Sequence, residues 1–162
     1  MSSEIFAKMN CSVARALSEV GERWSLLIVR EAFLGSTRFE QFHSRLGVAR
    51  NILTARLEVL TEAGIFDRIV TSTNARIYDY QLTDKGRDLL SVIAAIMHWG
   101  DKWANPDVGP PIVLVDIKTG QPVPQVLLRR SKGEPIPAHD ISIKAGRGAT
   151  PRTRARLAAQ IL

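Results

Sequence analysis

Three polar residues near the middle of the chain have the chemistry of a set that reads DNA. Arg50 and Asn51 lie in the first turn of a helical pattern and Thr54 lies one turn further on, where base contacts usually originate. Arginine can form two hydrogen bonds with guanine, and asparagine can form two with adenine. The alternative is that these exposed polar side chains are only solvated.

Two neighbouring polar segments could bind the sugar-phosphate backbone. The first precedes a helical pattern, where hydroxyl, guanidinium and amide groups can bind phosphate. It consists of Ser36, Thr37 and Arg38. The second lies between two strand patterns, from which side chains can reach the minor groove or a phosphate. It contributes Thr73, Asn74 and Arg76.

Two short helical patterns between Phe39 and Gly64 must position these side chains. Apolar residues recur at helical spacing in both patterns, first at Phe39, Phe42 and Leu46 and then at Ile52, Leu53, Leu57 and Leu60. The patterns meet at a tight turn around Gly47. Two helices joined in this way are typical of a helix-turn-helix motif, whose second helix enters the DNA major groove. Arg56 turns toward the apolar side, which favours an ion pair with Glu31 or Glu58 over a DNA contact.

Further elements flank this motif. Helical patterns cover residues 12–20 and 23–34, and alternating patterns at residues 65–70 and 76–82 predict two strands. A hairpin directly after a recognition helix is a wing. Thr83 can then cap a long helix that extends to Trp103. We therefore predict an α+β fold, mainly α, with a winged helix-turn-helix domain over residues 1–104.

The long helix carries more apolar surface than one core contact needs. One reading is packing against Trp24 within the chain. The other is a partner helix in a homodimer, which palindromic DNA sites favour. The residues on this helix predicted for the dimer contact are Ile93, Ile96, Met97, Trp99 and Trp103.

The composition changes after the long helix. Residues 105–111 contain three prolines and a glycine and predict a linker. Beyond it, β-branched runs at residues 112–117, 126–128 and 141–143, with similar Gly-containing segments thirteen residues apart, predict a small β-rich extension over residues 112–162. Thr150 and Pro151 can start a short basic helix. Dimer extension, effector binding and nonspecific DNA contact all remain open as roles for this extension.

Charge and composition limit the classes of function. The net charge is +6, yet residues 1–103 hold 13 Lys and Arg against 12 Asp and Glu, whereas residues 104–162 hold nine against four. A single cysteine excludes an internal disulfide and a multi-cysteine zinc site. No catalytic motif is present, and we expect neither enzyme activity, nor a metal, nor a cofactor. Without a secretory segment or an apolar run long enough to span a membrane, the expected location is the cytoplasm.

A set of short segments follows one another in a recognisable order. They are Cys11-Ser12-Val13, residues 22–31, Arg38-Phe39, residues 53–57, Gly64, residues 80–86 and Trp99-Gly100. Together they resemble the HxlR type of winged helix-turn-helix transcriptional regulators, in the MarR-like group, over about residues 10 to 104. The resemblance implies a cytoplasmic homodimer held by the first and last helices of the domain, which adds Val13 and Leu17 to the predicted contact. It also implies sequence-specific DNA binding, often controlled by a small molecule or by oxidation.

The chain departs from that pattern at the start of the recognition helix. Ala49 stands where the family commonly has serine, so the usual hydroxyl cap is missing, at a cost of about 1 kcal/mol unless Asn51 or the turn compensates. We include Ala49 in the DNA-binding set by its position. Arg50 replaces a frequent proline, and Asn74-Ala75 replaces a common Pro-Pro at the wing tip.

Cys11 matches a position that responds to oxidants or electrophiles in some similar regulators. Reactivity requires exposure and a depressed pKa, neither of which the sequence reveals. A redox-sensing thiol and a buried, inert cysteine therefore both remain open.

We expect a homodimeric, sequence-specific regulator of double-stranded, pseudo-palindromic operator DNA. It is expected to act as a repressor and to respond to a small-molecule effector or a redox signal. The alternative is an effector-binding or protein-interaction module whose winged-helix domain does not read DNA. The near-neutral charge of residues 1–103 motivates this alternative.

Overall fold

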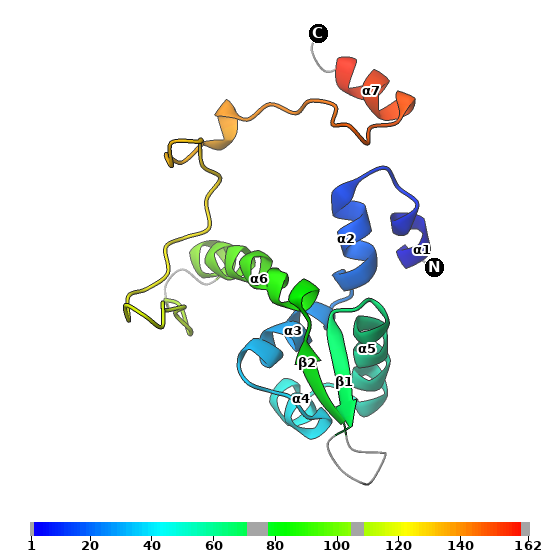
Figure 1. Ribbon diagram of the computed structural model, residues 1–162, viewed down its shortest axis with the longest axis vertical. Coiled ribbons are helices and arrows are strands. Elements are labelled where there is room, and N and C mark those ends of the chain that lie inside the picture. The colour runs from blue at the N-terminus through cyan, green and yellow to red at the C-terminus, as the bar shows by residue number, and fades with distance from the viewer. Residues whose placement is uncertain (1, 71–77, 105–108, 160–162) are drawn as a thin grey trace. The chain divides into compact units, whose positions relative to one another are not determined.

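The computed structural model describes residues 2–70, 78–104 and 109–159 and divides into two compact units (Figure 1). The central unit is Glu19–Val126. The terminal unit combines Met1–Ser18 with Leu127–Leu162. The predicted wing-tip residues Thr73, Asn74 and Arg76 lie outside the described residues.

The central unit contains four helices and a hairpin in its described part. Its core consists of apolar side chains from every one of these elements, including Ile28, Phe42, Leu57 and Phe66. The predicted helix-turn-helix and the predicted strands are confirmed. The elements are α3 (Ser25–Phe33), α4 (Phe39–Leu46), α5 (Arg50–Glu62), β1 (Phe66–Val70), β2 (Tyr78–Leu82) and α6 (Asp84–Trp103).

The turn between α4 and α5 depends on Gly47. This residue ends α4 with a φ of 62°, in the left-handed region that glycine adopts without steric cost, and its amide donates to the carbonyl of His43. Val48 follows and is buried, so its side chain fixes the turn against the core. The helices therefore leave the turn in one orientation.

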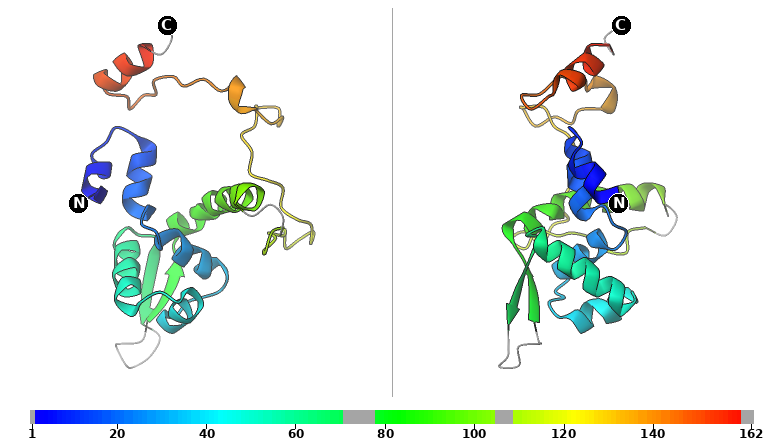
Figure 2. Two further views of the ribbon diagram at one scale, coloured as in Figure 1. Left: turned by 180° about the vertical axis from the view of Figure 1, so that it is seen from behind. Right: turned by 90° about the vertical axis from the view of Figure 1, so that its right-hand side faces the viewer.

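The two strands form an antiparallel hairpin with Phe66 opposite Leu82 and Val70 opposite Tyr78. A bridge between Arg38 and Asp79 adds a short third edge. The chain passes from α5 into β1 at the end of the hairpin opposite its tip, and α5 packs along β1 (Figure 2). The start of α5 consequently lies at the end of the hairpin where β1 finishes and β2 begins.

The α6 helix begins as the sequence predicts. The hydroxyl of Thr83 accepts a hydrogen bond from the amide of Gly86 and donates to the carbonyl of Gly64. Further along, Ile93 is only 6% exposed and Met97 packs against the core. Both residues were predicted for the dimer contact. The structure corrects this prediction for Ile93, which is buried in the core of the chain, whereas Met97 is partly buried and its predicted dimer contact stays a prediction.

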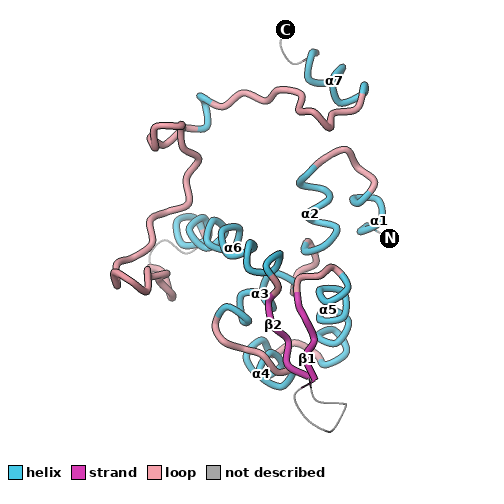
Figure 3. The backbone as a smooth tube through the Cα atoms, in the orientation of Figure 1, coloured by secondary structure: helices cyan, strands magenta, loops and turns pink. Residues whose placement is uncertain are grey.

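The extension differs from the prediction. Its described residues form no strand (Figure 3). Two of its hydrogen-bonded turns each carry one isolated bridge, Val115 to Pro122 and Arg129 to Pro135. The similar segments therefore make similar turns, with Gly120 and Gly133 at positive φ, but each is too short to pair into a sheet. The predicted basic helix is present as α7 (Pro151–Ala158), and the side chain of Thr150 caps it.

The terminal unit also contains α1 (Ser2–Ala7) and the first part of α2 (Ser12–Val20), with a short 3₁₀ turn, η1, at Ala138–Asp140. Within the described residues, no helix has the length and apolar character needed to cross a membrane.

Candidate nucleic-acid interface

The α5 helix presents a polar face to solvent and buries the opposite one. Leu53, Leu57 and Leu60 are fully buried, while Asn51 and Thr54 are exposed. Neither polar side chain has a hydrogen-bond partner among the residues that the structure describes. Ile52 was expected on the buried side, yet it is 40% exposed because it lies at the flank of the leucine stripe. The exposed face of α5 thus presents the side chains of Asn51 and Thr54 beside that of Ile52.

Arg50 has a partner that the sequence did not predict. Its guanidinium forms two hydrogen bonds with the carboxylate of Glu40, at 2.8 and 2.7 Å, and lies over the ring of Phe39. The hydrogen bond from Arg50 lowers the pKa of Glu40 below its usual value, and the carboxylate raises the pKa of Arg50. Because both side chains are exposed, an incoming anion can replace Glu40 as the partner of Arg50.

The first turn of α5 has no side-chain cap. Ala49 occupies the N-cap position, its methyl side chain cannot accept a hydrogen bond, and Asn51 does not supply a cap. The cap that the sequence lacks is therefore also missing from the fold. Helix amide groups left in this state attract anions, and the positive end of the helix dipole adds to the attraction.

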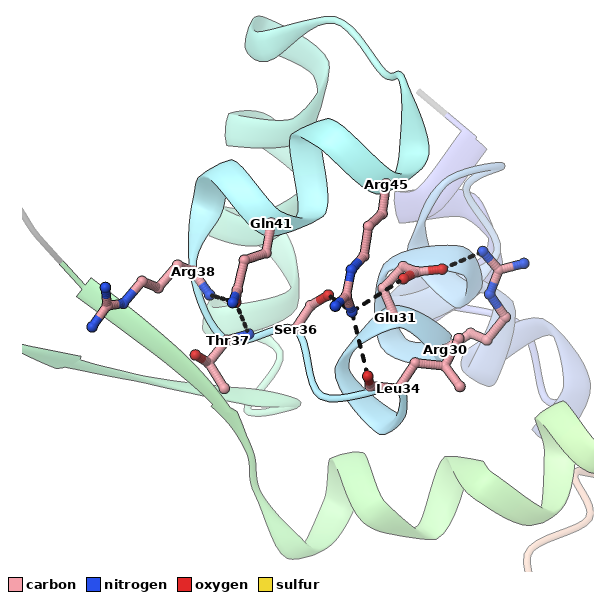
Figure 4. A network of polar contacts seen from close by, with 8 residues as sticks. All are labelled: Arg30, Glu31, Leu34, Ser36, Thr37, Arg38, Gln41 and Arg45. Carbon is pink, nitrogen blue, oxygen red and sulfur yellow. Dashed lines mark hydrogen bonds and ion pairs between the residues drawn. The ribbon is translucent and has the colours of Figure 1, made fainter.

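The segment before α4 differs from the expected phosphate site (Figure 4). Ser36 is 1% exposed, and its hydroxyl accepts a hydrogen bond from Arg45, so the structure corrects the prediction that it binds phosphate. The amides of Thr37 and Arg38 both donate to the side-chain oxygen of Gln41, at 2.8 and 3.0 Å. The side chain of Arg38 extends outward (Figure 4). Its Nε donates to the carboxylate of Asp79 at 3.2 Å.

The buried carboxylate of Glu31 helps to hold α4 in place. Glu31 is buried and pairs with Arg30, and its other oxygen lies 3.9 Å from Arg45 (Figure 4). Arg45 also donates to the carbonyl of Leu34, which joins the end of α3 to α4. The network fixes α4 against α3 because a buried carboxylate is costly unless it is paired.

Arg56 forms an ion pair, although with a different partner from those predicted. Its guanidinium lies 3.8 Å from the carboxylate of Glu22, which replaces the predicted Glu31 or Glu58. The side chain of Arg56 is three-quarters buried. This arrangement holds α5 to the segment before α3 and directs Arg56 away from the exposed face.

Three aromatic rings connect the motif to the hairpin. Phe42 on α4, Phe66 on β1 and Tyr80 on β2 meet edge to face, with centroid distances of 6.2 to 6.3 Å. Such edge-to-face contacts are favourable and restrict the orientation of each ring. The three rings therefore hold α4 against the two strands of the hairpin.

Comparisons with known proteins agree with this arrangement. The profile of the HxlR-like helix-turn-helix family matches residues 19–108. The chain belongs to this family. It is 43% identical over 137 residues to the uncharacterized HTH-type transcriptional regulator Rv3095 of Mycobacterium tuberculosis strain H37Rv, covering 85% of this chain and 87% of that protein.

Two solved structures show the same fold. PA1607, crystallised as a candidate transcription factor, is 39% identical with a TM-score of 0.79, covering 88% of this chain and 99% of PA1607. The redox regulator HypR in its reduced form is 27% identical with a TM-score of 0.53, covering 60% of this chain and 96% of HypR. The HxlR-like chain is thus a helix-turn-helix transcriptional regulator, and regulators of this kind are normally not enzymes.

Sequence reasoning missed several residues at this interface of the HxlR-like protein. Glu40 binds Arg50 across the turn between α4 and α5, where sequence spacing gives no signal. Gln41 lies three residues after the N-cap residue Arg38, at the spacing of a capping box, and this local signal could have been read from the sequence. Cys11 is exposed, which removes the buried alternative for this thiol. Among the described residues, no group of three or more His, Cys, Asp and Glu side chains could hold a metal ion.

Proposed function

We propose that this HxlR-like protein is a homodimeric repressor that reads operator DNA with α5. The observation that carries the proposal is the exposed pair Asn51 and Thr54, whose side chains have no partner within the described part of the chain. They lie three positions apart and share one face of the helix. Asn51 suits adenine, and Thr54 can bond to a base edge or contact a thymine methyl group.

The electrostatic contribution comes from few groups. Arg50 exchanges Glu40 for a guanine edge or a phosphate, and Arg38 exchanges Asp79 for a phosphate. Uncapped amides at the start of α5 supply a further phosphate contact without adding charge. Each arginine that binds a phosphate contributes roughly 0.9 to the salt dependence of binding. With two arginines per protomer, a plot of the logarithm of the binding constant against the logarithm of the salt concentration therefore has a slope of about −4 for a dimer.

The dimer forms through the outward face of α6. Val92, Ile96, Trp99 and Trp103 are exposed at steps of four, three and four residues, the spacing at which helices pack together in coiled coils. Trp99 is 64% exposed and Trp103 is 63% exposed, so both indoles are available for a partner. Val13 and Leu17 on α2 are exposed and add to the contact. A twofold dimer places two recognition helices about 34 to 36 Å apart, one turn of DNA.

The repressor acts in the cytoplasm and releases its operator when a small molecule binds or when Cys11 is modified. The exposed thiol supports the second route, and the structural likeness to HypR, described as a redox regulator, supports control by a signal.

The test measures binding to the promoter of the protein's own gene by fluorescence anisotropy over a range of salt concentrations. Asn51→Ala with Thr54→Ala is expected to weaken operator binding by about 5- to 150-fold or more, since one two-bond contact contributes roughly 1 to 3 kcal/mol. Binding to random DNA stays unchanged. Arg50→Ala reduces the salt slope by about 1 per protomer.

Arg87→Ala is the matched control, because it removes an exposed arginine from the start of α6, which follows the last residue of β2 and lies away from the start of α5. Its salt slope is expected to equal that of the wild type. Unchanged operator affinity in the Asn51 and Thr54 variant would refute this reading face. Binding of the wild type with neither sequence preference nor salt dependence would refute the DNA-reading function itself.

A further inference from the structure

The terminal unit contains a solvent-open cavity of about 640 Å³, and none of the described residues that line it is among those proposed to contact DNA. Its walls come from the segment between α1 and α2, from the first turns of α7 and from Ile143. Sites for small molecules commonly measure about 300 to 1,000 Å³. The cavity is therefore large enough for a metabolite-sized ligand.

Asn10 holds the two walls of the cavity together. Its side-chain nitrogen donates to the carbonyl of Gly148 at 3.0 Å. Its side-chain oxygen accepts from the amide of Thr150 at 3.1 Å and from the hydroxyl of Thr153 at 2.8 Å. One amide group thus connects the beginning of the chain to the capped start of α7, which gives the cavity a defined wall.

Three cations line the cavity and lack an anion. Lys8, Arg152 and Arg156 have no ion-pair partner among the described residues, and no carboxylate appears among the described residues that line this space. Arg152 and Arg156 are four positions apart, on one face of α7. By contrast, Arg130 in the same unit pairs with Asp140. The positive end of α7 adds to the field, so an anion is the ligand that this wall favours.

The remaining wall has apolar character. Met9, Ile143 and Leu157 contribute side chains to it. Inorganic phosphate would leave these side chains in water, whereas a carboxylate attached to a hydrocarbon body would contact both parts of the cavity. We propose that the cavity binds an amphipathic organic carboxylate, which acts as the effector of this regulator.

The position of the cavity supports an effector role, which rests on the proposed DNA-binding function. Cys11 lines the cavity and immediately precedes α2. At the other end of that helix, Val20 is buried in the core of the central unit. A ligand that moves the start of α2 therefore acts on a continuous helix whose end belongs to the DNA-binding core.

The test needs no DNA, because Cys11 is the single thiol of the chain and reports on occupancy of the cavity. The rate of Cys11 alkylation by iodoacetamide, a neutral reagent, is measured in the full-length protein with 2-naphthoate, neutral 2-naphthamide or inorganic phosphate. We expect protection by 2-naphthoate alone. In Arg152→Gln with Arg156→Gln, the concentration needed for protection rises by about tenfold or more, since charge-assisted hydrogen bonds are lost.

Arg154→Gln is the matched control, because this residue is on the same helix but is not among the residues that line the cavity. It is expected to retain wild-type protection, and circular dichroism checks that each variant is folded. Equal protection by 2-naphthamide or by phosphate would refute the proposed ligand class. Absence of protection in the wild type, or full protection in the double variant, would refute the site. Operator binding is measured separately, so either result leaves the DNA-reading proposal intact.

Discussion

Gly86 sets how closely the last helix of the central unit approaches the hairpin. A Cβ atom at this position would lie 2.3 Å from the carbonyl oxygen of Ile65 and 2.9 Å from a methyl group of Leu82. The first of these is a backbone atom in the turn that leads from α5 into β1, and it cannot rotate away. Gly86→Ala is therefore expected to push the start of α6 outward.

The size of the effect follows from opposing contributions. Alanine favours a helix over glycine by about 1 kcal/mol. Against this, an ordinary contact requires the start of α6 to retreat by about 1 Å, and overpacking of this kind costs roughly 1 to 3 kcal/mol. The retreat also lengthens the hydrogen bond from the amide of Thr83 to Ile65, now 3.1 Å, and weakens the Thr83 cap, each worth about 1 kcal/mol. We expect a net loss of about 2 to 4 kcal/mol in the free energy of unfolding.

Urea denaturation followed by tryptophan fluorescence measures this loss, at equal protein concentration because the proposed dimer would add to stability. The matched control is Gly100→Ala on the same helix, where a Cβ atom would meet nothing within 4 Å. That variant is expected to keep or gain stability, by up to about 1 kcal/mol. If Gly86→Ala unfolds at the same urea concentration as the wild type, the close approach of α6 to the β1 turn is not a constraint, and the reasoning fails.

Two further predictions concern the dimer and the Arg50 pair. Trp99→Ser with Trp103→Ser is expected to give a folded monomer in sedimentation velocity, whereas Leu34→Ser, another exposed apolar position, leaves the dimer intact. Glu40 is expected to titrate below pH 4.5 by NMR and to return toward 4.5 in Arg50→Gln. Because the folded-state pKa is depressed, the stabilisation from this pair is present above the unfolded-state pKa and disappears as the pH falls through the folded-state value.

The main elements of the central unit could be predicted because local physics determines them. Leucines at helical spacing define the buried side of α5, Gly47 permits the turn, and Thr83 caps α6 within four residues of its own sequence. The β-branched runs of the extension predicted strands, yet strands require a partner at the right distance. Each turn there makes only one bridge. The strand propensity of a segment does not show whether a second segment lies close enough to pair with it.

The side-chain partners at the interface were harder to predict because they form across turns. Ser36 looked like a phosphate ligand by its position before a helix, but Arg45 from the far end of that helix covers it. Arg50 looked free, but Glu40 reaches it across the helix-turn-helix. These pairs depend on how α4 packs against α3 and α5, and the pattern of a single sequence does not specify that packing.

Under the proposed function, the Arg50 pair accounts for how a nearly neutral domain would select DNA. Arg50 and Arg38 each hold a carboxylate that must leave when a phosphate or a base arrives, so replacing one anion by another yields little net affinity. Nonspecific DNA offers only that exchange. In the proposed reading mode, an operator would also offer hydrogen bonds to Asn51 and Thr54, which have no competing partner within the described residues, and it would offer them twice to the proposed dimer. The carboxylates therefore lower the affinity for every DNA sequence by a similar amount. The difference in affinity between an operator and other DNA then comes from the base contacts.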